Sequence, residues 1–341
     1  MSKSAVFGCA GPTLSADEAA FFRRADPWGF ILFGRNVTAP PQVRALVDEL
    51  RNCVGRADAP VLIDQEGGRV ARLGPPHWRR YPPARAYAGL AARDPGLGCE
   101  MAWLGARLIA HDLRALGISV DCAPVLDVPA AGAHDVVGDR AFGETSAVVA
   151  LLGRAAAEGL LAGGVLPVIK HIPGHGRAMS DSHHALPIVR APRGDLEGVD
   201  FAPFAELADM PVAMTAHVVF ADIDAAAPAT LSAKVIGEVV RGAIGFSGLL
   251  VSDDLSMRAL TGSIAERAAS ALAAGCDVVL HCNGDLAEMR EVAAAAGPLE
   301  GRAAARAAAA LARVAPAPES FDQEACARRF DAAFEMRFAS A

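Results

Sequence analysis

Eight short apolar segments recur along the chain, and most are followed by a turn and then by a helix-like pattern. They are residues 5–10, 29–33, 60–64, 117–124, 165–170, 211–217, 248–254 and 277–282. They do not alternate apolar with polar residues, which is typical of strands covered on both faces in a parallel sheet. Helical patterns lie between them at 40–53, 98–116, 145–162, 200–208, 232–240 and 265–274. Eight such units predict a single-domain α/β fold, a (β/α)8 barrel of the TIM type.

Polar side chains gather at the carboxyl ends of these segments. They are Asp64, Asp121, Lys170, His171, His217, Asp253, Asp254 and His281. In a (β/α)8 barrel this end carries the active site, whereas an open sheet would collect such residues at one switch point. The chain has neither a GxGxxG motif after a strand nor a GxxxxGK[ST] motif. Dinucleotide binding and P-loop phosphate binding therefore have no support.

The last part of the chain differs in composition from the barrel segments. From residue 299 it is rich in Ala and Arg, and it ends on an amphipathic stretch. Alanine favours helix. We therefore expect a catalytic barrel over residues 1–298 and C-terminal helices packed on the barrel over 299–341. A partner-binding role for the final helix remains an alternative.

Charge and composition exclude several classes of partner. The net charge is −7, aromatic residues make up 6%, and no basic run occurs, so we expect no nucleic-acid partner. No apolar run reaches the roughly 18–20 residues that span a bilayer, and the N-terminal apolar stretch is too short for a signal peptide. Seven scattered cysteines suit a reducing compartment. We expect a cytoplasmic monomer that binds no membrane.

The segment KHIPGHGRAMSDSHHALP, residues 170–187, holds four of the nine histidines. His171 and His175 have the i, i+4 spacing of a helical metal site. Pro173 and the neighbouring glycines oppose a helix, so the spacing loses that meaning. We expect no metal and no cofactor, and we keep a metal-dependent hydrolase as a weaker alternative that chelation would test.

Asp181, Ser182 and His183 form a different kind of pair within this segment. A carboxylate two residues from an imidazole can accept its N–H and stabilise the imidazolium, which makes His183 a candidate general acid/base on a mobile loop. A solvated turn at Asp181 remains the simpler reading. Of the adjacent Asp253 and Asp254, one faces the barrel mouth while the other is free to cap a helix, and the residues alone do not say which.

The stretch IDQEGGRVARL, residues 63–73, adds Asp64 and Arg72, and GDRAF, residues 138–142, adds Arg140. A carboxylate accepts hydrogen bonds from sugar hydroxyls and a guanidinium donates them. For Arg69 we favour a structural ion pair.

These motifs, together with KHIPGHG…DSHHALP and LLVSDDLSM, resemble the family 3 glycoside hydrolases. The similarity covers residues 5–290 and is greatest to the single-domain bacterial β-N-acetylhexosaminidases that recycle cell-wall muropeptides in the cytoplasm. It implies retaining hydrolysis of terminal β-linked N-acetylglucosamine (GlcNAc), with Asp253 as nucleophile and Asp254 as a cap. It also implies a His183–Asp181 dyad as acid/base and a place for His175 at the base of the loop. The implied sugar-binding residues are Asp64, Arg72, Arg140, Lys170 and His171.

Other functions stay open on the same residues. A histidine acid would not repel phosphate as a carboxylate would, so a GlcNAc-releasing phosphorylase is the main alternative. A non-catalytic muropeptide sensor would bind sugar tightly without turnover.

Overall fold

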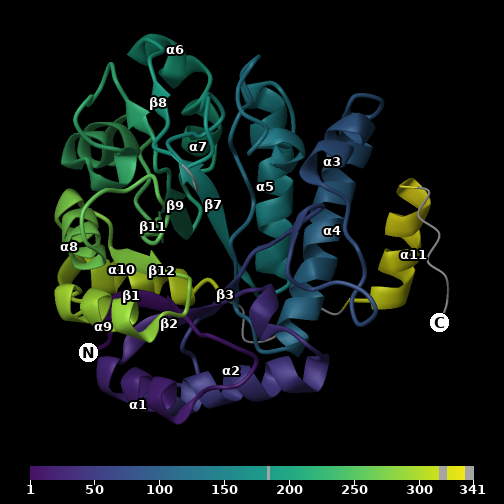
Figure 1. Ribbon diagram of the computed structural model, residues 1–341. Coiled ribbons are helices and arrows are strands. Elements are labelled where there is room, and N and C mark those ends of the chain that lie inside the picture. Colours follow the sequence, from purple (N-terminus) through teal and green to yellow (C-terminus); the bar gives the residue numbers. More distant parts are fainter. Residues whose placement is uncertain (183–184, 315–320, 335–341) are drawn as a thin grey trace.

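The computed structural model describes residues 1–182, 185–314 and 321–334. Its centre is a closed barrel of eight parallel strands that follow one another around the ring in chain order (Figure 1). The strands are β1 Lys3–Gly8, β2 Pro27–Leu32, β3 Val61–Ile63, β6 Val120–Asp121, β7 Leu166–Ile172, β9 Val212–Thr215, β11 Leu249–Asp254 and β12 Val278–His281. Each overlaps one of the eight apolar segments, and the predicted TIM-type (β/α)8 fold is confirmed.

Helices surround the barrel (Figure 1). They are α1 Ala16–Ala25, α2 Pro40–Val54, α3 Ala84–Ala91, α4 Pro95–Ala115, α5 Ser146–Ala162, α6 Arg193–Gly198, α7 Ala202–Glu206, α8 Ile264–Ala274, α9 Leu286–Ala295, α10 Gly301–Leu311 and α11 Gln323–Ala333. A π-helix covers Val235–Ala243, and single 3-10 turns cover Gly34–Asn36, Gly138–Arg140 and Ala229–Leu231. Short strands pair outside the barrel: β4 Gln65–Gly67 with β5 Val70–Ala71, and β8 Ile188–Val189 with β10 Val219–Phe220. No helix in the described ranges is long and apolar enough to cross a membrane.

Two predicted elements are markedly shorter in the structure, and the helix predicted over 232–240 is the π-helix Val235–Ala243. The helix expected over 200–208 is only the five-residue α7, which has a proline in its first turn. The regular part of β6 is shorter than the segment 117–124, but backbone bonding to β7 continues beyond it. The Val168 N–H donates to the Ala123 carbonyl at 2.9 Å, and the Lys170 N–H donates to the Pro124 carbonyl at 3.1 Å. Residues 122–124 therefore still belong to the barrel wall.

Local sequence signals set several helix ends. The side chains of Ser15 and Ser263 each accept from the backbone three residues on, and Glu18 and Glu266 return the bond, which closes a capping box at α1 and α8. Helix α8 ends at Gly275 with φ of 116°, a left-handed conformation that favours glycine.

The apolar core has two layers. One lies inside the barrel, where side chains from all eight strands meet, and the other lies between the strands and the helices. Leu299, Ala307 and Ala310 join the inner layer, so α10 and the chain just before it cover one end of the barrel. Each buried aliphatic side chain there contributes roughly 1.5–3 kcal/mol. The other end remains available for a site.

Helix α11 packs on the outside of the barrel beside α4 (Figure 1). Its Phe330 is fully buried and contacts the rings of Tyr81 and Tyr87, and Asp331 accepts two bonds from Arg79 at 3.0 and 3.2 Å. The division between residues 298 and 299 stays a prediction, since α10 shares the barrel core.

Candidate active site

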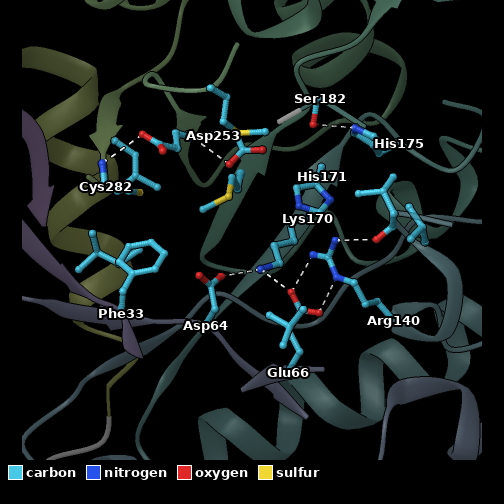
Figure 2. Close-up of a pocket in the computed structure, with 18 of the residues that line it drawn as sticks. Phe33, Asp64, Glu66, Arg140, Lys170, His171, His175, Ser182, Asp253 and Cys282 are labelled. Atoms are coloured by element: carbon cyan, nitrogen blue, oxygen red, sulfur yellow. Dashed lines mark hydrogen bonds and ion pairs between the residues drawn. The ribbon is translucent and has the colours of Figure 1, made fainter. Parts of the chain in front are cut away.

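A cavity of about 280 Å³ opens at the carboxyl ends of the barrel strands (Figure 2). The structure brings the predicted nucleophile and all predicted sugar-binding residues to its wall: Asp64, Arg72, Arg140, Lys170, His171 and Asp253. Apolar side chains complete the lining, among them Ile31, Phe33, Met214, Met257 and Leu280. The cavity therefore combines a charged floor with an apolar wall.

Three other strand-end residues do not reach the cavity. Asp121, His217 and His281 have no exposed surface. Because successive strand residues point to opposite faces, His281 faces the helices when Leu280 lines the cavity, and it bonds Glu288 at 2.9 Å. Burial raises the pKa of Asp121 to about 7, and its carboxylate accepts the Gln65 N–H at 2.9 Å.

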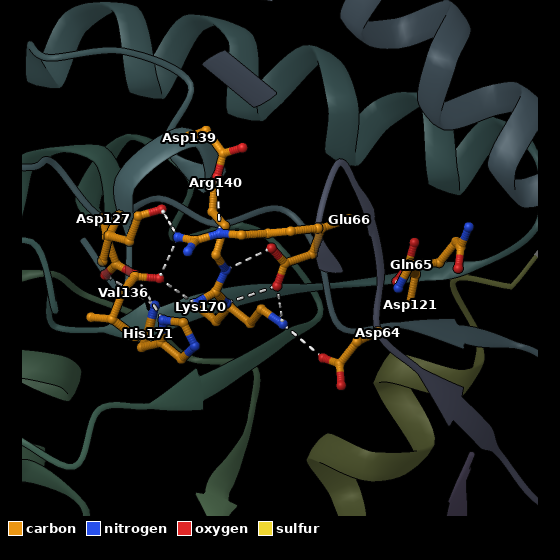
Figure 3. A network of polar contacts seen from close by, with 12 residues as sticks. Asp64, Gln65, Glu66, Asp121, Asp127, Val136, Asp139, Arg140, Lys170 and His171 are labelled. Carbon is orange, nitrogen blue, oxygen red and sulfur yellow. Dashed lines mark hydrogen bonds and ion pairs between the residues drawn. The ribbon is translucent and has the colours of Figure 1, made fainter. Parts of the chain in front are cut away.

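Buried charges of alternating sign form the floor (Figure 3). The Lys170 ammonium lies 2.8 Å from both Asp64 and Glu66. Arg72 donates to Asp64 at 3.0 Å, and Arg140 donates two bonds to Glu66 at 2.8 and 2.9 Å. Burial acts to raise the pKa of both carboxyls, but the adjacent cations outweigh it, so the pKa of each lies below its usual value. Both carboxylates are therefore ionised acceptors.

Glu66 is not among the site residues predicted from the sequence. It lies two residues after Asp64 in an extended stretch, so the two side chains share a face. This spacing of two residues is the feature of the sequence that could have identified Glu66. Glu66 connects Lys170 to Arg140, which makes it the link between two predicted sugar-binding residues. Arg69 lies at the edge, paired with Asp139 at 3.0 Å, as favoured from the sequence.

Asp127, also not singled out, orients two histidines. It is fully buried, and its carboxylate lies 2.7 Å from His171 Nδ1 while accepting the His175 N–H at 2.7 Å. Burial opposes ionisation, but His171 outweighs it and lowers the pKa of Asp127 to about 2. The carboxylate can only accept, so His171 Nδ1 carries a proton and its Nε2 remains for a ligand.

Asp253 and Asp254 end strand β11 and both contribute to the cavity wall. The Asp253 carboxylate accepts the Asp254 N–H at 2.8 Å. Burial acts to raise the pKa of Asp253, but favourable electrostatic interactions with the adjacent His217 and His171 rings, together with this amide, outweigh it and lower the pKa. An ionised carboxylate therefore faces the cavity from a rigid strand.

The expectation that Asp254 caps a helix is wrong. Helix α8 begins ten residues later, at Ile264, and is capped by Ser263. Asp254 instead accepts the Ser256 N–H and the Cys282 N–H, both at 3.1 Å. Its side chain thus joins the end of β11 to the chain after β12, because the loop after β11 makes a turn before the next helix starts.

The loop after β7 is held at its base by several contacts. Arg177 donates to the buried Asp200 at 2.6 Å, and Gly176 packs so closely on Val128 that a Cβ would lie 1.9 Å from the Val128 carbonyl oxygen. His175 lies at this base, as expected, and its Nε2 is 3.2 Å from the Ser182 hydroxyl (Figure 2).

The predicted dyad lies further along this loop. Ser182 lines the cavity, and Asp181 lines an adjoining pocket beside Arg140. His183 and His184 lie outside the described residues, so the His183–Asp181 dyad stays a prediction. Within the described part of the chain, no three His, Cys, Asp or Glu residues are arranged to hold a metal ion.

Comparisons with known proteins agree on one family. Residues 15–317 match the model of the glycosyl hydrolase family 3 N terminal domain. The chain is 41% identical over 286 residues to a beta-hexosaminidase from Alkalilimnicola ehrlichii, covering 82% of this chain and 80% of that one. It is also 41% identical over 283 residues to a beta-hexosaminidase from Methylococcus capsulatus, covering 82% of each.

Solved structures show the same relationship. NagZ from Neisseria gonorrhoeae superposes with a TM-score of 0.83 at 31% identity, covering 98% of this chain and 96% of that one. A glycoside hydrolase family 3 beta-N-acetylglucosaminidase from Paenibacillus sp. str. FPU-7 gives a TM-score of 0.83 at 33% identity, covering 96% of this chain and 67% of that one. The barrel therefore shares its overall fold with these solved structures.

Proposed function

The chain belongs to glycosyl hydrolase family 3 and is a glycoside hydrolase, and we propose that it is a retaining exo-β-N-acetylglucosaminidase. The observation that carries the proposal is that two distant segments line one cavity. One is the end of β11 with Asp253, and the other is Ser182, the residue between Asp181 and His183. A retaining glycosidase needs a nucleophile and an acid on either side of the scissile bond, and these segments supply both.

In the first step, an Asp253 carboxylate oxygen attacks the anomeric carbon. The glycosidic C–O bond breaks, and the leaving oxygen takes a proton from His183. In the second step, water gives a proton to His183 while its oxygen attacks the same carbon, which frees Asp253. The lowered pKa of Asp253 keeps the nucleophile ionised. An imidazole, whose unperturbed pKa is about 6.5, is chemically suited to act as both acid and base around neutral pH.

The charged floor is suited to binding sugar hydroxyls. Asp64 accepts from them, while Lys170, Arg72, Arg140 and His171 present N–H groups or ring nitrogens. Because these groups already hold one another by ion pairs, they are positioned before the sugar arrives. Preorganised donors lose little conformational freedom on binding.

The cavity is compact, about 280 Å³, which favours removal of a terminal residue over cleavage within a polymer. We propose peptidoglycan-derived muropeptides that carry GlcNAc on anhydro-N-acetylmuramic acid as the substrate, and a cytoplasmic monomer as the working form. Turnover of purified muropeptides against chitobiose tests the substrate. Cell fractionation and sedimentation test location and assembly.

The decisive experiment labels the nucleophile. A 5-fluoro β-GlcNAc glycoside should inactivate the enzyme and mark a peptide that contains Asp253, and Asp253→Ala should abolish release of 4-nitrophenol from its β-GlcNAc glycoside while the circular dichroism stays unchanged. Asp209→Asn, a surface carboxylate paired with Arg154, is the matched control and should retain activity. Label on any other residue contradicts the assignment.

The same assay separates hydrolysis from phosphorolysis. Hydrolysis predicts free GlcNAc and no dependence on phosphate, whereas formation of GlcNAc-1-phosphate would favour the phosphorylase. Activity that survives exhaustive chelation excludes the metal-dependent alternative.

A further inference from the structure

Three side chains with no exposed surface lie next to the candidate nucleophile but outside the cavity: Thr215, His217 and Thr230. They come from the end of β9, the residues just after it, and the 3-10 turn Ala229–Leu231. Their polar atoms form a continuous row. Thr215 Oγ1 is 2.8 Å from Thr230 Oγ1, which is 2.7 Å from His217 Nδ1.

Both ends of this row bind the backbone of β11 around Asp253. At one end, the Asp253 N–H donates to Thr215 Oγ1 at 3.3 Å. At the other, His217 Nε2 lies 3.0 Å from the Asp254 carbonyl oxygen. The row therefore binds the β11 backbone on both sides of the Asp253 side chain. It holds the N–H of Asp253 and the C=O of Asp254.

Counting protons gives the row a direction. The Asp254 carbonyl can only accept, so His217 Nε2 carries a proton. Burial lowers the pKa of His217 against the opposing effect of Asp253, so the ring is neutral and Nδ1 accepts. Thr230 then donates its single hydroxyl proton to Nδ1, Thr215 donates to Thr230, and the Asp253 N–H donates to Thr215.

In the described surroundings, the Thr215 hydroxyl also faces the Cys276 sulfur, and the Thr230 hydroxyl has one alternative acceptor. The Ala216 carbonyl lies 3.1 Å from Thr230 Oγ1 and competes for its proton. The contact to His217 Nδ1 is shorter, at 2.7 Å. Loss of either the Thr230 hydroxyl or the imidazole leaves buried polar atoms unpaired, and an unpaired buried group costs more than the net value of one hydrogen bond.

We propose that Thr230 and His217 are positioning residues that fix the backbone on either side of Asp253, at its own N–H and at the Asp254 C=O, and so aim its carboxylate at the anomeric carbon. Neither residue lines the cavity, so each acts through the backbone of Asp253 and Asp254. The proposal rests on the proposed function, in which Asp253 is the nucleophile. A displacement of the nucleophile by about 1 Å can lower the reaction rate by as much as 100-fold.

The test compares Thr230→Val, which has the same shape without the hydroxyl, with Thr230→Ser, which keeps the hydroxyl. The 5-fluoro β-GlcNAc glycoside first titrates the competent sites in each preparation. The rate constant of labelling per titrated site is then measured, together with competitive inhibition by free GlcNAc. We expect Thr230→Val to slow labelling by roughly 10- to 100-fold with an unchanged GlcNAc inhibition constant, and Thr230→Ser to restore most of the rate.

A purely structural role gives a different result, namely fewer titrated sites that each react at the wild-type rate, and that outcome overturns the proposal. His217→Leu, which removes both the donor for the Asp254 carbonyl and the acceptor for Thr230, serves as the second variant and should slow labelling at least as much as Thr230→Val. If the wild-type label falls on a residue other than Asp253, the proposed function itself fails. If it falls on Asp253 and both variants react at the wild-type rate, only the positioning proposal fails.

Discussion

Glu66 is expected to matter strongly for stability, because two buried cations depend on it. Its side chain is 6% exposed, and it bonds the Lys170 ammonium, which is 3% exposed, and the Arg140 guanidinium, which is 12% exposed. Glu66→Gln removes the negative charge and retains the shape. Lys170 still has Asp64, but Arg140 loses its bidentate partner.

Removing one partner of a buried ion pair typically costs 3–5 kcal/mol, since the remaining charge is left uncompensated. The glutamine amide oxygen still accepts one hydrogen bond, so we expect a loss of about 3 kcal/mol in the free energy of unfolding at pH 7. The pKa of Glu66 is lowered in the folded protein, so its contribution is present above its unfolded pKa of about 4.3 and is lost as pH falls through the folded pKa. Wild type and variant should therefore converge in acid.

Urea unfolding at pH 7 measures the loss in the free energy of unfolding, and urea unfolding at pH 3.5 shows whether the difference between wild type and variant becomes smaller in acid. Asp209→Asn removes a carboxylate that is 60% exposed and pairs with Arg154, and it should cost less than about 1 kcal/mol at either pH. The double variant with Arg140→Gln should recover part of the loss, since it removes the stranded charge. A loss below about 1 kcal/mol for Glu66→Gln at pH 7 refutes the reasoning, because it would mean that solvent screens the network.

Three further outcomes are expected. Burial lowers the pKa of His175 to about 4, so the unfolded chain, with a histidine pKa of about 6.5, binds a proton that the folded protein does not. The free energy of unfolding should therefore fall by up to about 1.4 kcal/mol for each pH unit between about pH 6.5 and pH 4. Urea unfolding should show a smaller slope in His175→Gln. Gly176→Ala places a Cβ 1.9 Å from the Val128 carbonyl oxygen and should destabilise the protein by about 1–3 kcal/mol, measured by urea unfolding, with Gly194→Ala as an unhindered control. Phe330→Ala removes the buried ring that docks α11, a loss of about 3–5 kcal/mol that limited proteolysis should detect as earlier cleavage at the C-terminal end.

The barrel was predictable from the chain because its signal is local. Apolar runs of five to eight residues mark the strands, and the polar residues that follow each run mark one rim. Asp64, Lys170 and Asp253 were found in this way, since each directly ends such a run. The family resemblance then suggested their roles.

The partners of those residues were not predictable in the same way. Asp127 looks like an isolated acid within an apolar stretch, and only the close approach of β7 makes it the acceptor for His171 and His175. Asp254 looks like a helix cap, but the chain turns before the next helix and the carboxylate bonds Cys282 instead.

The sequence by itself thus determined the barrel, the rim on which the site lies and the side chains able to react there. The tertiary structure alone decided which charges pair, which histidine is held in which tautomer, and which strand-end residues face the helices. The reason is physical. Hydrophobic periodicity is carried by neighbouring residues, whereas an ion pair such as Glu66–Arg140 or the contact between Thr230 and His217 exists only after distant segments have packed together.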